Sequence, residues 1–216
     1  MVSEPRFIAG GHSRFDVNQQ DVGDCWFLAA AADLTLHDGL FYRVVPPDQD
    51  FTPDNYAGIF HFQFWRYGEW VDVVIDDRLP YTYTKYRLFS VYSADENEFW
   101  SALLEKAYAK MYGSYEHLEG GWTSNALVDF TGGMAQYYFD VRKTRKDEII
   151  KILSRNLEQS FYGAGFDKFR NEEDSWTSGL VSGHAYSITG LETINTDDDQ
   201  LILVRLRNPW GVMEWK

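Results

Sequence analysis

The apolar run that follows the only cysteine of the chain constrains its fold most strongly. From Cys25 to Ala32 no side chain is polar, and the next charged residue is Asp33. Gly23 and Asp24, residue types that favour turns and helix N-caps, stand directly before the run. This order predicts a helix that begins at Cys25. Because a helix that is apolar on every side is normally buried, we expect it at the centre of the protein.

The position of Cys25 allows two interpretations of its thiol. A side chain in the first turn of a helix faces unpaired backbone N–H groups and the positive end of the helix dipole. Both favour the thiolate, which is the reactive form. Free cysteines are also often small, buried and unreactive apolar residues. The stretch by itself leaves both interpretations open.

The length and charge of the chain narrow the classes of function. Its 216 residues suffice for one large or two small domains. The net charge of −13 disfavours nucleic acid and anionic membranes as partners, and it leaves carboxylates for a hard cation. A single cysteine allows no internal disulfide, which fits a reducing compartment. We expect neither a signal peptide nor a membrane-spanning segment, because no apolar run is long enough.

The N-terminal half begins with a loop and a hairpin. Residues 7–16 contain two glycines, and their pattern alone indicates an ordinary surface turn. Residues 59–65 alternate like a half-buried strand, and residues 67–69 turn the chain into a second strand over 70–75.

Two helices are predicted further along the chain. Residues 93–96 have the form of a capping box, which predicts a long helix that ends at Tyr112 before Gly113. A second helix is expected over 146–157. Between them, the pair Gly132-Gly133 is a flexible joint and our predicted domain boundary. Apolar side chains expected in the core recur along the first helix at Phe99, Trp100, Leu103, Ala107, Tyr108 and Met111.

Two strands near the C-terminus place a histidine beside an asparagine. His184 precedes a strand over 185–189, and Asn208 follows a strand over 201–207. If these strands form an antiparallel hairpin that turns at Thr196, the two side chains face each other.

A histidine held by a fixed amide is the arrangement that activates a cysteine. Taken singly, His184 fits a structural histidine and Asn208 fits a turn. Their predicted contact, together with Cys25 at a helix start, favours a catalytic role for all three.

Three blocks along the chain resemble the active-site blocks of calpains, which are calcium-dependent, papain-like cysteine proteases of the cytosol. These blocks are Gln19-x5-Cys25-Trp26, Gly183-His184-Ala185-Tyr186 and Arg207-Asn208-Pro209-Trp210-Gly211. The resemblance extends in order over nearly the whole chain. Other segments similar to that family are 60–65, 76–80, 98–108 and 129–133.

The resemblance implies a role for each residue of these blocks. Cys25 would be the nucleophile, His184 the general base and acid, and Asn208 the residue that orients the imidazole. Gln19 would donate a side-chain N–H to the oxyanion hole beside the Cys25 backbone N–H. Trp210 would cover the His–Asn hydrogen bond and wedge between two half-domains.

The resemblance also implies a substrate cleft between the half-domains. Gly121 and Gly183 are similar to backbone positions that line this cleft. The loop around residues 174–176 corresponds to a mobile gate above it. Arg14 resembles a residue that ties the half-domains together.

The family binds calcium within the protease core, and this implies a metal site in the glycine-containing loop. Carried over by position, the ligands are the carbonyl oxygens of Ala9 and Gly11 and the carboxylates of Asp16 and Glu98. Ligands that are all oxygens suit calcium. Of the family's second calcium site, only Glu214 has a counterpart in this chain.

The family pattern continues well past the Asn-Pro-Trp-Gly block, whereas this chain ends at Lys216. We therefore expect a fragment, or a naturally truncated product, whose second lobe is incomplete.

The sequence as a whole predicts an α+β fold, a papain-like two-lobed cysteine protease core. A helical lobe over 1–132 carries Cys25 and the calcium loop, and a β-rich lobe over 133–216 carries His184 and Asn208. The expected function is calcium-dependent endopeptidase activity on cytoplasmic proteins through a thioester intermediate. Regulatory domains or a subunit outside this chain are expected partners.

Two other functions are considered. A non-catalytic calcium-binding module fits the incomplete second lobe. A transglutaminase-like acyltransferase also uses a Cys–His pair, but Asn208 and the Gln19 spacing speak against it.

Overall fold

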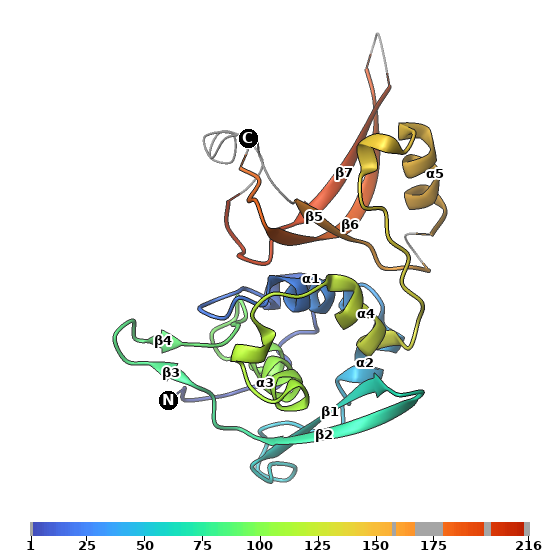
Figure 1. Ribbon diagram of the computed structural model, residues 1–216. Helices are drawn as coiled ribbons and strands as arrows, with labels where there is room; N and C mark the ends of the chain where they lie inside the picture. Colours follow the sequence, from blue (N-terminus) through green and yellow to red (C-terminus); the bar gives the residue numbers. More distant parts are fainter. Residues whose placement is uncertain (1, 157–158, 167–178, 197–199, 214–216) are drawn as a thin grey trace.

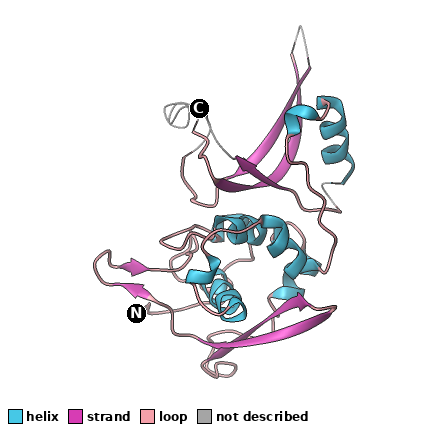
Figure 2. Ribbon diagram, viewed as in Figure 1, coloured by secondary structure: helices cyan, strands magenta, loops and turns pink. Residues whose placement is uncertain are grey.

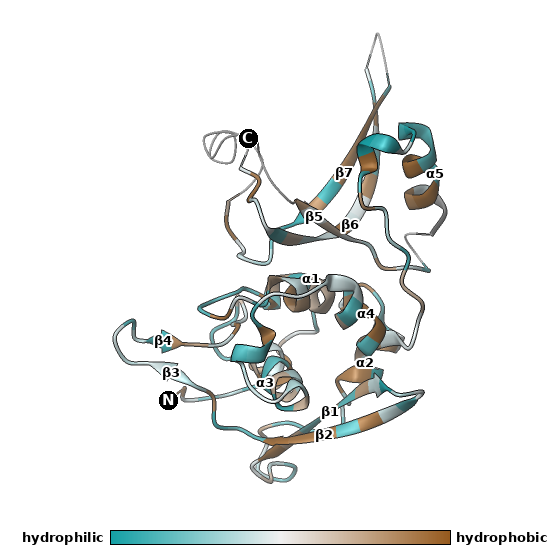
Figure 3. Ribbon diagram, in the orientation of Figure 1, coloured by the Kyte–Doolittle hydropathy of each residue, from teal (hydrophilic) through white to brown (hydrophobic). Residues whose placement is uncertain are grey.

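The computed structural model describes residues 2–156, 159–166, 179–196 and 200–213. The helix α1 (Cys25–Leu34) lies between the two halves of the molecule in Figure 1. Every residue of α1 after Cys25 is buried, as its apolar run predicts. Figure 3 colours most of α1 as hydrophobic, whereas the more exposed α5 (Lys146–Asn156) shows hydrophilic and hydrophobic faces.

On one side of α1 the chain forms helix α2 (Asp38–Val44) and the hairpin of β1 (Ile59–Arg66) and β2 (Glu69–Asp76). Tyr67 and Gly68 join the strands with φ angles of 55° and 90°. Two left-handed residues match the right-handed twist of the strands, so the predicted hairpin is confirmed. The short elements of this half are the 3₁₀ helices Arg14–Asp16 and Glu116–Leu118 and the strands β3 (Tyr81–Thr82) and β4 (Arg87–Leu88).

The long helix α3 (Trp100–Tyr112) begins later than its sequence pattern indicates. The predicted capping box from Ser93 is wrong as a helix start. The Ser93 hydroxyl accepts the N–H of Asp95 at 3.1 Å and donates to the Glu98 carboxylate at 2.6 Å. These side-chain bonds favour turns over helix in this segment. The predicted end is right, because Gly113 follows with a φ angle of 111°.

Helix α4 (Thr123–Thr131) ends at Gly132, which adopts the left-handed conformation with a φ angle of 69°. Residues 133–140 then lead without regular structure towards α5, where the predicted helix is confirmed. In α5 the side chain of Leu153 is buried. The division of the chain at Gly132-Gly133 stays a prediction.

The C-terminal half forms one antiparallel sheet in the order β5 (Gly163–Phe166), β6 (His184–Asn195) and β7 (Gln200–Arg207). Figure 2 shows this sheet on the opposite side of α1 from the β1–β2 hairpin. The mixture of helices and small antiparallel sheets agrees with the predicted α+β class. Strand β5 has no counterpart in the sequence prediction.

One buried network joins three elements of the N-terminal half. The carboxylate of Asp129 accepts hydrogen bonds from Tyr108 at 2.8 Å and Tyr112 at 3.0 Å. The guanidinium of Arg66 donates to the two oxygens of Asp129 at 3.1 and 3.2 Å. This carboxylate therefore ties β1, α3 and α4 together behind α1.

The buried Asp33 gives a first prediction on stability. It is 0% exposed, and burial raises its pKa well above the usual value. No hydrogen-bond partner for its oxygens lies within the described residues. Because the folded state binds the proton more tightly than the unfolded state, Asp33 lowers stability as pH rises above the ordinary aspartate range.

We therefore expect Asp33→Asn to raise the free energy of unfolding more at pH 8 than at pH 5, with a difference of about 1–3 kcal/mol. Urea unfolding at both pH values measures this. The exposed carboxylate Asp54 supplies the control variant Asp54→Asn, which should change the free energy of unfolding little. An equal response of the Asp33 variant at both pH values would contradict the prediction.

Candidate active site

Cys25 is half-buried at the first position of α1, where this helix packs against β6. Burial raises the pKa of its thiol, and the negative charge of Asp24 acts in the same direction. The backbone N–H of Ala185 hydrogen-bonds to the sulfur and opposes this shift. The backbone N–H groups of Cys25 and Trp26 at the helix N-terminus favour the thiolate, as the sequence indicates, but desolvation has the larger effect on the pKa.

The structure brings His184 and Asn208 together. The Nε2 atom of His184 lies 2.7 Å from Oδ1 of Asn208, and both residues are buried. The Asn208 amide N–H₂ donates to the Val212 carbonyl at 2.9 Å, and the backbone N–H of Trp210 donates to Oδ1 at 3.0 Å. These contacts fix Oδ1 towards the imidazole. His184 must then carry its proton on Nε2, which leaves Nδ1 as the basic nitrogen.

The strand register that brings His184 and Asn208 together differs from the one predicted from the sequence. The antiparallel hairpin is confirmed, but Asn195 pairs with Gln200, so the pairing is not centred on Thr196. A register shift lies between Ile188 and Gly190. With Ser187 opposite Arg207, Asn208 lies past the strand end rather than directly across from His184.

A tight turn makes the contact possible. The N–H of Gly211 donates to the Asn208 carbonyl at 3.0 Å, which closes a turn after β7. Gly211 has a φ angle of 72°, and a Cβ there would overlap Oδ1 of Asn18. Only glycine fits this position, so the Asn-Pro-Trp-Gly order has a local structural reason.

Aromatic rings enclose the imidazole of His184. The Trp210 ring lies 4.6 Å away between centroids, and the Tyr186 ring meets it edge-on at 5.0 Å. Burial lowers the pKa of His184, and the hydrogen bond to Asn208 partly opposes this effect. The imidazole is therefore neutral near pH 7 and able to accept a proton.

Gln19 connects the cysteine stretch to the segment after β7. Its backbone N–H donates to the Pro209 carbonyl at 2.8 Å. One hydrogen of its side-chain amide is bound to the Val22 carbonyl at 2.7 Å. The amide retains a second hydrogen, and its place as an oxyanion donor stays a prediction.

The two predicted cleft glycines have different local environments. A Cβ at Gly121 would overlap the Trp26 indole, whose N–H donates to the Leu118 carbonyl at 2.8 Å. Gly183 has a φ angle of 67°, and its N–H donates to Phe166 at 2.6 Å. Both positions therefore favour glycine, one for space and the other for backbone conformation.

The predicted calcium ligands Asp16 and Glu98 are both buried. Asp16 accepts the N–H of Ser13 at 2.6 Å, and Glu98 accepts the N–H of Ala9 at 2.6 Å. Burial and the nearby charge of Asp16 raise the pKa of Glu98 to about 7. Glu98 lies two residues before α3, rather than within the first turn of the long helix as the sequence indicates.

This donor set fits a cation. Two buried carboxylates with like charge lie close together beside a loop in which Gly10 and Gly11 have positive φ angles of 73° and 103°. No group of three or more His, Cys, Asp or Glu side chains within the described ranges is placed to hold a metal. A cation here would thus need backbone carbonyls in addition to the two carboxylates, and those of Ala9 and Gly11 are the predicted ones.

Other predicted residues meet neighbours that the sequence does not indicate. The guanidinium of Arg14 lies 4.7 Å from the Phe15 ring centre, and burial and the nearby Arg205 lower its pKa. Arg205, on β7, therefore acts on Arg14 as a like charge. Glu214 and the predicted gate over 174–176 lie outside the described residues.

Sequence reasoning missed the part that Arg207 plays in joining the two halves. Its Nη2 atom donates to Oδ1 of Asn18 at 2.9 Å and to the Val17 carbonyl at 3.3 Å. A further bond runs to the carbonyl of Asn208. Arg207 directly precedes Asn208 in the Arg-Asn-Pro-Trp-Gly block, and this position is the sequence signal for its role.

Comparison with known proteins identifies the family. The model of the calpain family of cysteine proteases matches residues 1–216. Calpain clp-4 of Caenorhabditis elegans is 54% identical over 218 residues, which cover 100% of this chain and 30% of that protein. Calpain clp-1 of the same organism is 55% identical, covering 98% and 27%. The calpain-2 catalytic subunit of Gallus gallus is 53% identical, covering 100% and 30%.

The chain thus spans about 30% of the length of these relatives. The described residues contain no helix long and apolar enough to cross a membrane. The match over all of its residues, together with identities above one half, shows that this chain belongs to the calpain family of cysteine proteases.

Proposed function

We propose that this chain is the peptidase part of a calcium-dependent cysteine endopeptidase, with Cys25, His184 and Asn208 as its catalytic residues. The observation that carries the proposal is the 2.7 Å bond between His184 and Asn208 beside the α1 N-terminus, in a chain of the calpain family. Gln19 completes the proposed site as an oxyanion donor.

The reaction follows from the tautomer of His184. Asn208 holds the Nε2–H, so Nδ1 takes the proton of the Cys25 thiol as the sulfur attacks the peptide carbonyl carbon. The developing oxyanion accepts hydrogen bonds from the Cys25 backbone N–H and the Gln19 side chain. His184 then passes its proton to the leaving amine, and the acyl group stays on sulfur as a thioester. Water, deprotonated by His184, hydrolyses this thioester and restores the thiol.

The resting protonation states agree with this order of events. Burial raises the pKa of Cys25 and lowers that of His184, so the proton stays on sulfur while the site is empty. Transfer is then coupled to attack rather than complete beforehand. Trp210, packed on the imidazole, keeps solvent away from the His184–Asn208 bond.

Proteins are the proposed substrates. Gly121 and Gly183 would present backbone to an extended peptide, Gly183 because open space surrounds its Cβ position and Gly121 beside the Trp26 indole that packs on it. Such contacts would recognise the main chain of the substrate more than its side chains. The proposed two lobes, over 1–132 and 133–216, would hold the peptide between them, with Trp210 at their junction.

Calcium is the proposed cofactor, and Ala9, Gly11, Asp16 and Glu98 would hold it. When bound, the ion supplies positive charge that cancels the repulsion between the two buried carboxylates. The loop over 7–16 leads directly to Gln19 and Cys25, so fixing this loop also positions the cysteine stretch. Glu214 is the proposed ligand of a second calcium site.

We expect the double variant Asp16→Ala with Glu98→Ala to lose the response to calcium. Without the carboxylates the loop lacks its charged ligands, and the wild-type rise in peptide hydrolysis should fall by roughly 100-fold, the scale on which about 1 Å of misplacement acts. Tryptophan fluorescence during a calcium titration reports a conformational change of the loop over 7–16 independently of hydrolysis. The double variant Asp76→Ala with Asp77→Ala, at the β2 end, is the matched control. A wild-type response in the first double variant would place the metal site elsewhere.

A non-catalytic calcium-binding module is the second candidate function, favoured by the two neighbouring buried carboxylates of Asp16 and Glu98. A casein-type substrate assayed with and without calcium separates the two. Calcium-dependent cleavage supports the peptidase. Calcium-induced fluorescence change without cleavage supports the binding module.

We also propose a cellular compartment and partners for the enzyme. A lone cysteine that must stay reduced fits the reducing cytoplasm. The name of one relative, the calpain-2 catalytic subunit, describes a protein with subunits. By analogy, we propose that regulatory domains or a subunit outside these 216 residues act on this chain.

A further inference from the structure

The guanidinium of Arg207 makes hydrogen bonds to both halves of the chain at once. Its Nη1 atom donates to the carbonyl of Asn208, in the turn that carries the proposed orienting amide. Its Nη2 atom donates to Oδ1 of Asn18 at 2.9 Å and to the Val17 carbonyl at 3.3 Å. These acceptors lie in the segment directly before Gln19. One planar group therefore bridges the two segments that supply the proposed site.

The side chain of Asn18 has a fixed orientation. Asn18 is 7% exposed, and its Nδ2 atom donates to the carbonyls of Phe15 at 2.7 Å and Tyr92 at 3.3 Å. Because a guanidinium can only donate, the amide oxygen must face Arg207. The backbone of Asn18 also pairs with that of Tyr92 in both directions, at 3.0 and 3.1 Å. Asn18 is thus a rigid acceptor for the guanidinium within the N-terminal half.

A main-chain hydrogen bond joins the same two segments. The N–H of Gln19 donates to the carbonyl of Pro209 at 2.8 Å. Consecutive residues over 17–19 are therefore bonded to consecutive residues over 207–209. We call this set of contacts the clamp.

The clamp connects groups that the proposed reaction takes from different halves. Gln19 and Cys25 follow its N-terminal segment, and Asn208 lies within its C-terminal segment, bonded to His184 at 2.7 Å. Helix α1 also packs against β6, but apolar contacts are non-directional. The hydrogen bonds of the clamp fix both distance and direction.

We propose that Asn18 and Arg207 are positioning residues that hold the imidazole of His184 at the cysteine sulfur. The guanidinium fixes the Asn208 turn, and through it the imidazole, to the segment that leads into the cysteine helix. Displacing reacting groups by about 1 Å lowers a rate by roughly 100-fold, so loss of the clamp would separate the pair without removing either member. This inference rests on the proposed roles of Cys25 and His184.

Two substitutions break the clamp from its two sides. Arg207→Met keeps a long apolar side chain and removes the guanidinium donors. Asn18→Ala removes the side-chain acceptor and leaves Arg207 in place. Neither substitution changes Cys25 or His184, so both variants retain the reacting groups.

The readout is a double-mutant cycle on the reaction of Cys25 with dipyridyl disulfide in calcium, which releases an absorbing thione and needs no peptide. Since the chain has one cysteine, all reaction reports on Cys25. An imidazole placed as base should accelerate it, so His184→Ala should slow the wild type by roughly 100-fold. In either clamp variant, His184→Ala should slow the reaction by roughly tenfold at most, because the imidazole is already displaced. A purely structural role would leave the effect of His184→Ala unchanged.

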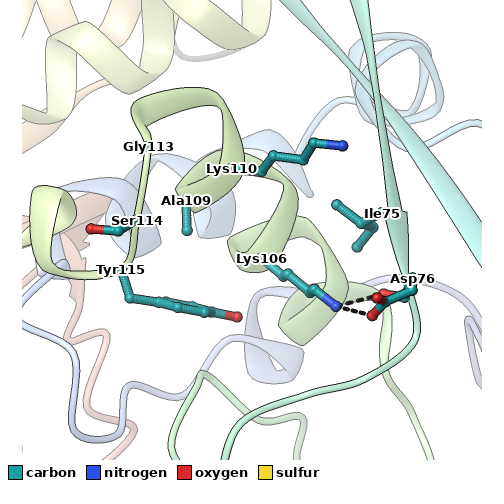
Figure 4. A pocket seen from close by; sticks show the side chains of 8 residues that line it. All are labelled: Ile75, Asp76, Lys106, Ala109, Lys110, Gly113, Ser114 and Tyr115. Atoms are coloured by element: carbon teal, nitrogen blue, oxygen red, sulfur yellow. Dashed lines mark hydrogen bonds and ion pairs between the residues drawn. The ribbon is translucent and has the colours of Figure 1, made fainter.

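The control variant breaks a bridge of the same kind away from the site. Lys106, on α3, donates to the carbonyls of Asp76 at 2.8 Å and Arg78 at 2.6 Å. It lines a cavity of about 340 Å³ between β2 and α3, and Figure 4 shows its bonds to Asp76. Lys106→Met removes this cation–carbonyl bridge without touching the clamp, so His184→Ala should keep its full effect there.

A full effect of His184→Ala in both folded clamp variants, equal to that in Lys106→Met, overturns the proposal. If circular dichroism shows that Arg207→Met does not fold, Asn18→Ala decides alone by the same criterion. A wild-type rate that does not depend on His184 contradicts the proposed base and overturns this inference with it. A chain whose cycle behaves as expected but which cleaves no peptide sustains this inference and contradicts the proposed function.

Discussion

Replacing Cys25 with alanine is expected to lower calcium-stimulated peptide hydrolysis by roughly 10⁴-fold or more. The chain has no second thiol that could take over as nucleophile. Cys25 is half-buried at the start of a helix whose other residues form the core, so removing its sulfur should leave the fold intact. Hydrolysis of a fluorogenic peptide measures the loss, and the near-ultraviolet spectrum checks the fold.

His184→Ala should reduce hydrolysis to a similar extent, because a nucleophile and its base act as a unit. Combining the two substitutions should add little to either one. Calcium-dependent hydrolysis that survives in the Cys25 variant would exclude the assigned nucleophile.

The second large effect is expected from Asp129→Ala, which should lower the free energy of unfolding by about 3–5 kcal/mol. Asp129 is 5% exposed and receives hydrogen bonds from two tyrosine hydroxyls as well as the Arg66 ion pair. Its removal leaves the guanidinium of Arg66 without this partner and the buried hydroxyl of Tyr108 without its acceptor. Urea unfolding measures the loss.

The matched control is Tyr112→Phe, which deletes one donor and leaves the Arg66–Asp129 ion pair in place. It should cost about 1 kcal/mol. Equal losses from both variants would show that the carboxylate is not the centre of this network.

The elements that the sequence predicts well are those in which local pattern and tertiary packing agree. The run from Cys25 to Ala32 is apolar on every face, and a buried helix is the structure that accommodates it. Tyr67-Gly68 joins two alternating segments, and this turn matches the strand twist. In both segments the local sequence pattern and the tertiary packing favour the same structure.

Other elements depend on contacts that local pattern does not contain. Ser93 offers a cap, but Glu98 binds its hydroxyl and the chain forms turns until Trp100. Strand β5 contains two glycines in Gly163–Phe166 and owes its extended form to pairing with β6. The register shift between Ile188 and Gly190 likewise follows from sheet geometry, not from residue order.

In the candidate site, too, some features follow from the sequence and others depend on tertiary contacts. The resemblance to the family indicated which side chains to examine, and the structure brings His184 to Asn208. The direction of the Cys25 pKa could not be read from its helix position, because burial and the charge of Asp24 depend on the packed structure.

Covalent trapping tests the central claim most directly. A peptide that carries a thiol-reactive electrophile at its scissile position is incubated with the chain in calcium, and the adduct is mapped by mass spectrometry. Cys25 as nucleophile and His184 as base predict a single adduct on Cys25, formed many times faster than with iodoacetamide and slowed to the iodoacetamide rate by His184→Ala. Hydrolysis of the parent peptide without an adduct on Cys25, or labelling at an unchanged rate in the His184 variant, would contradict the account.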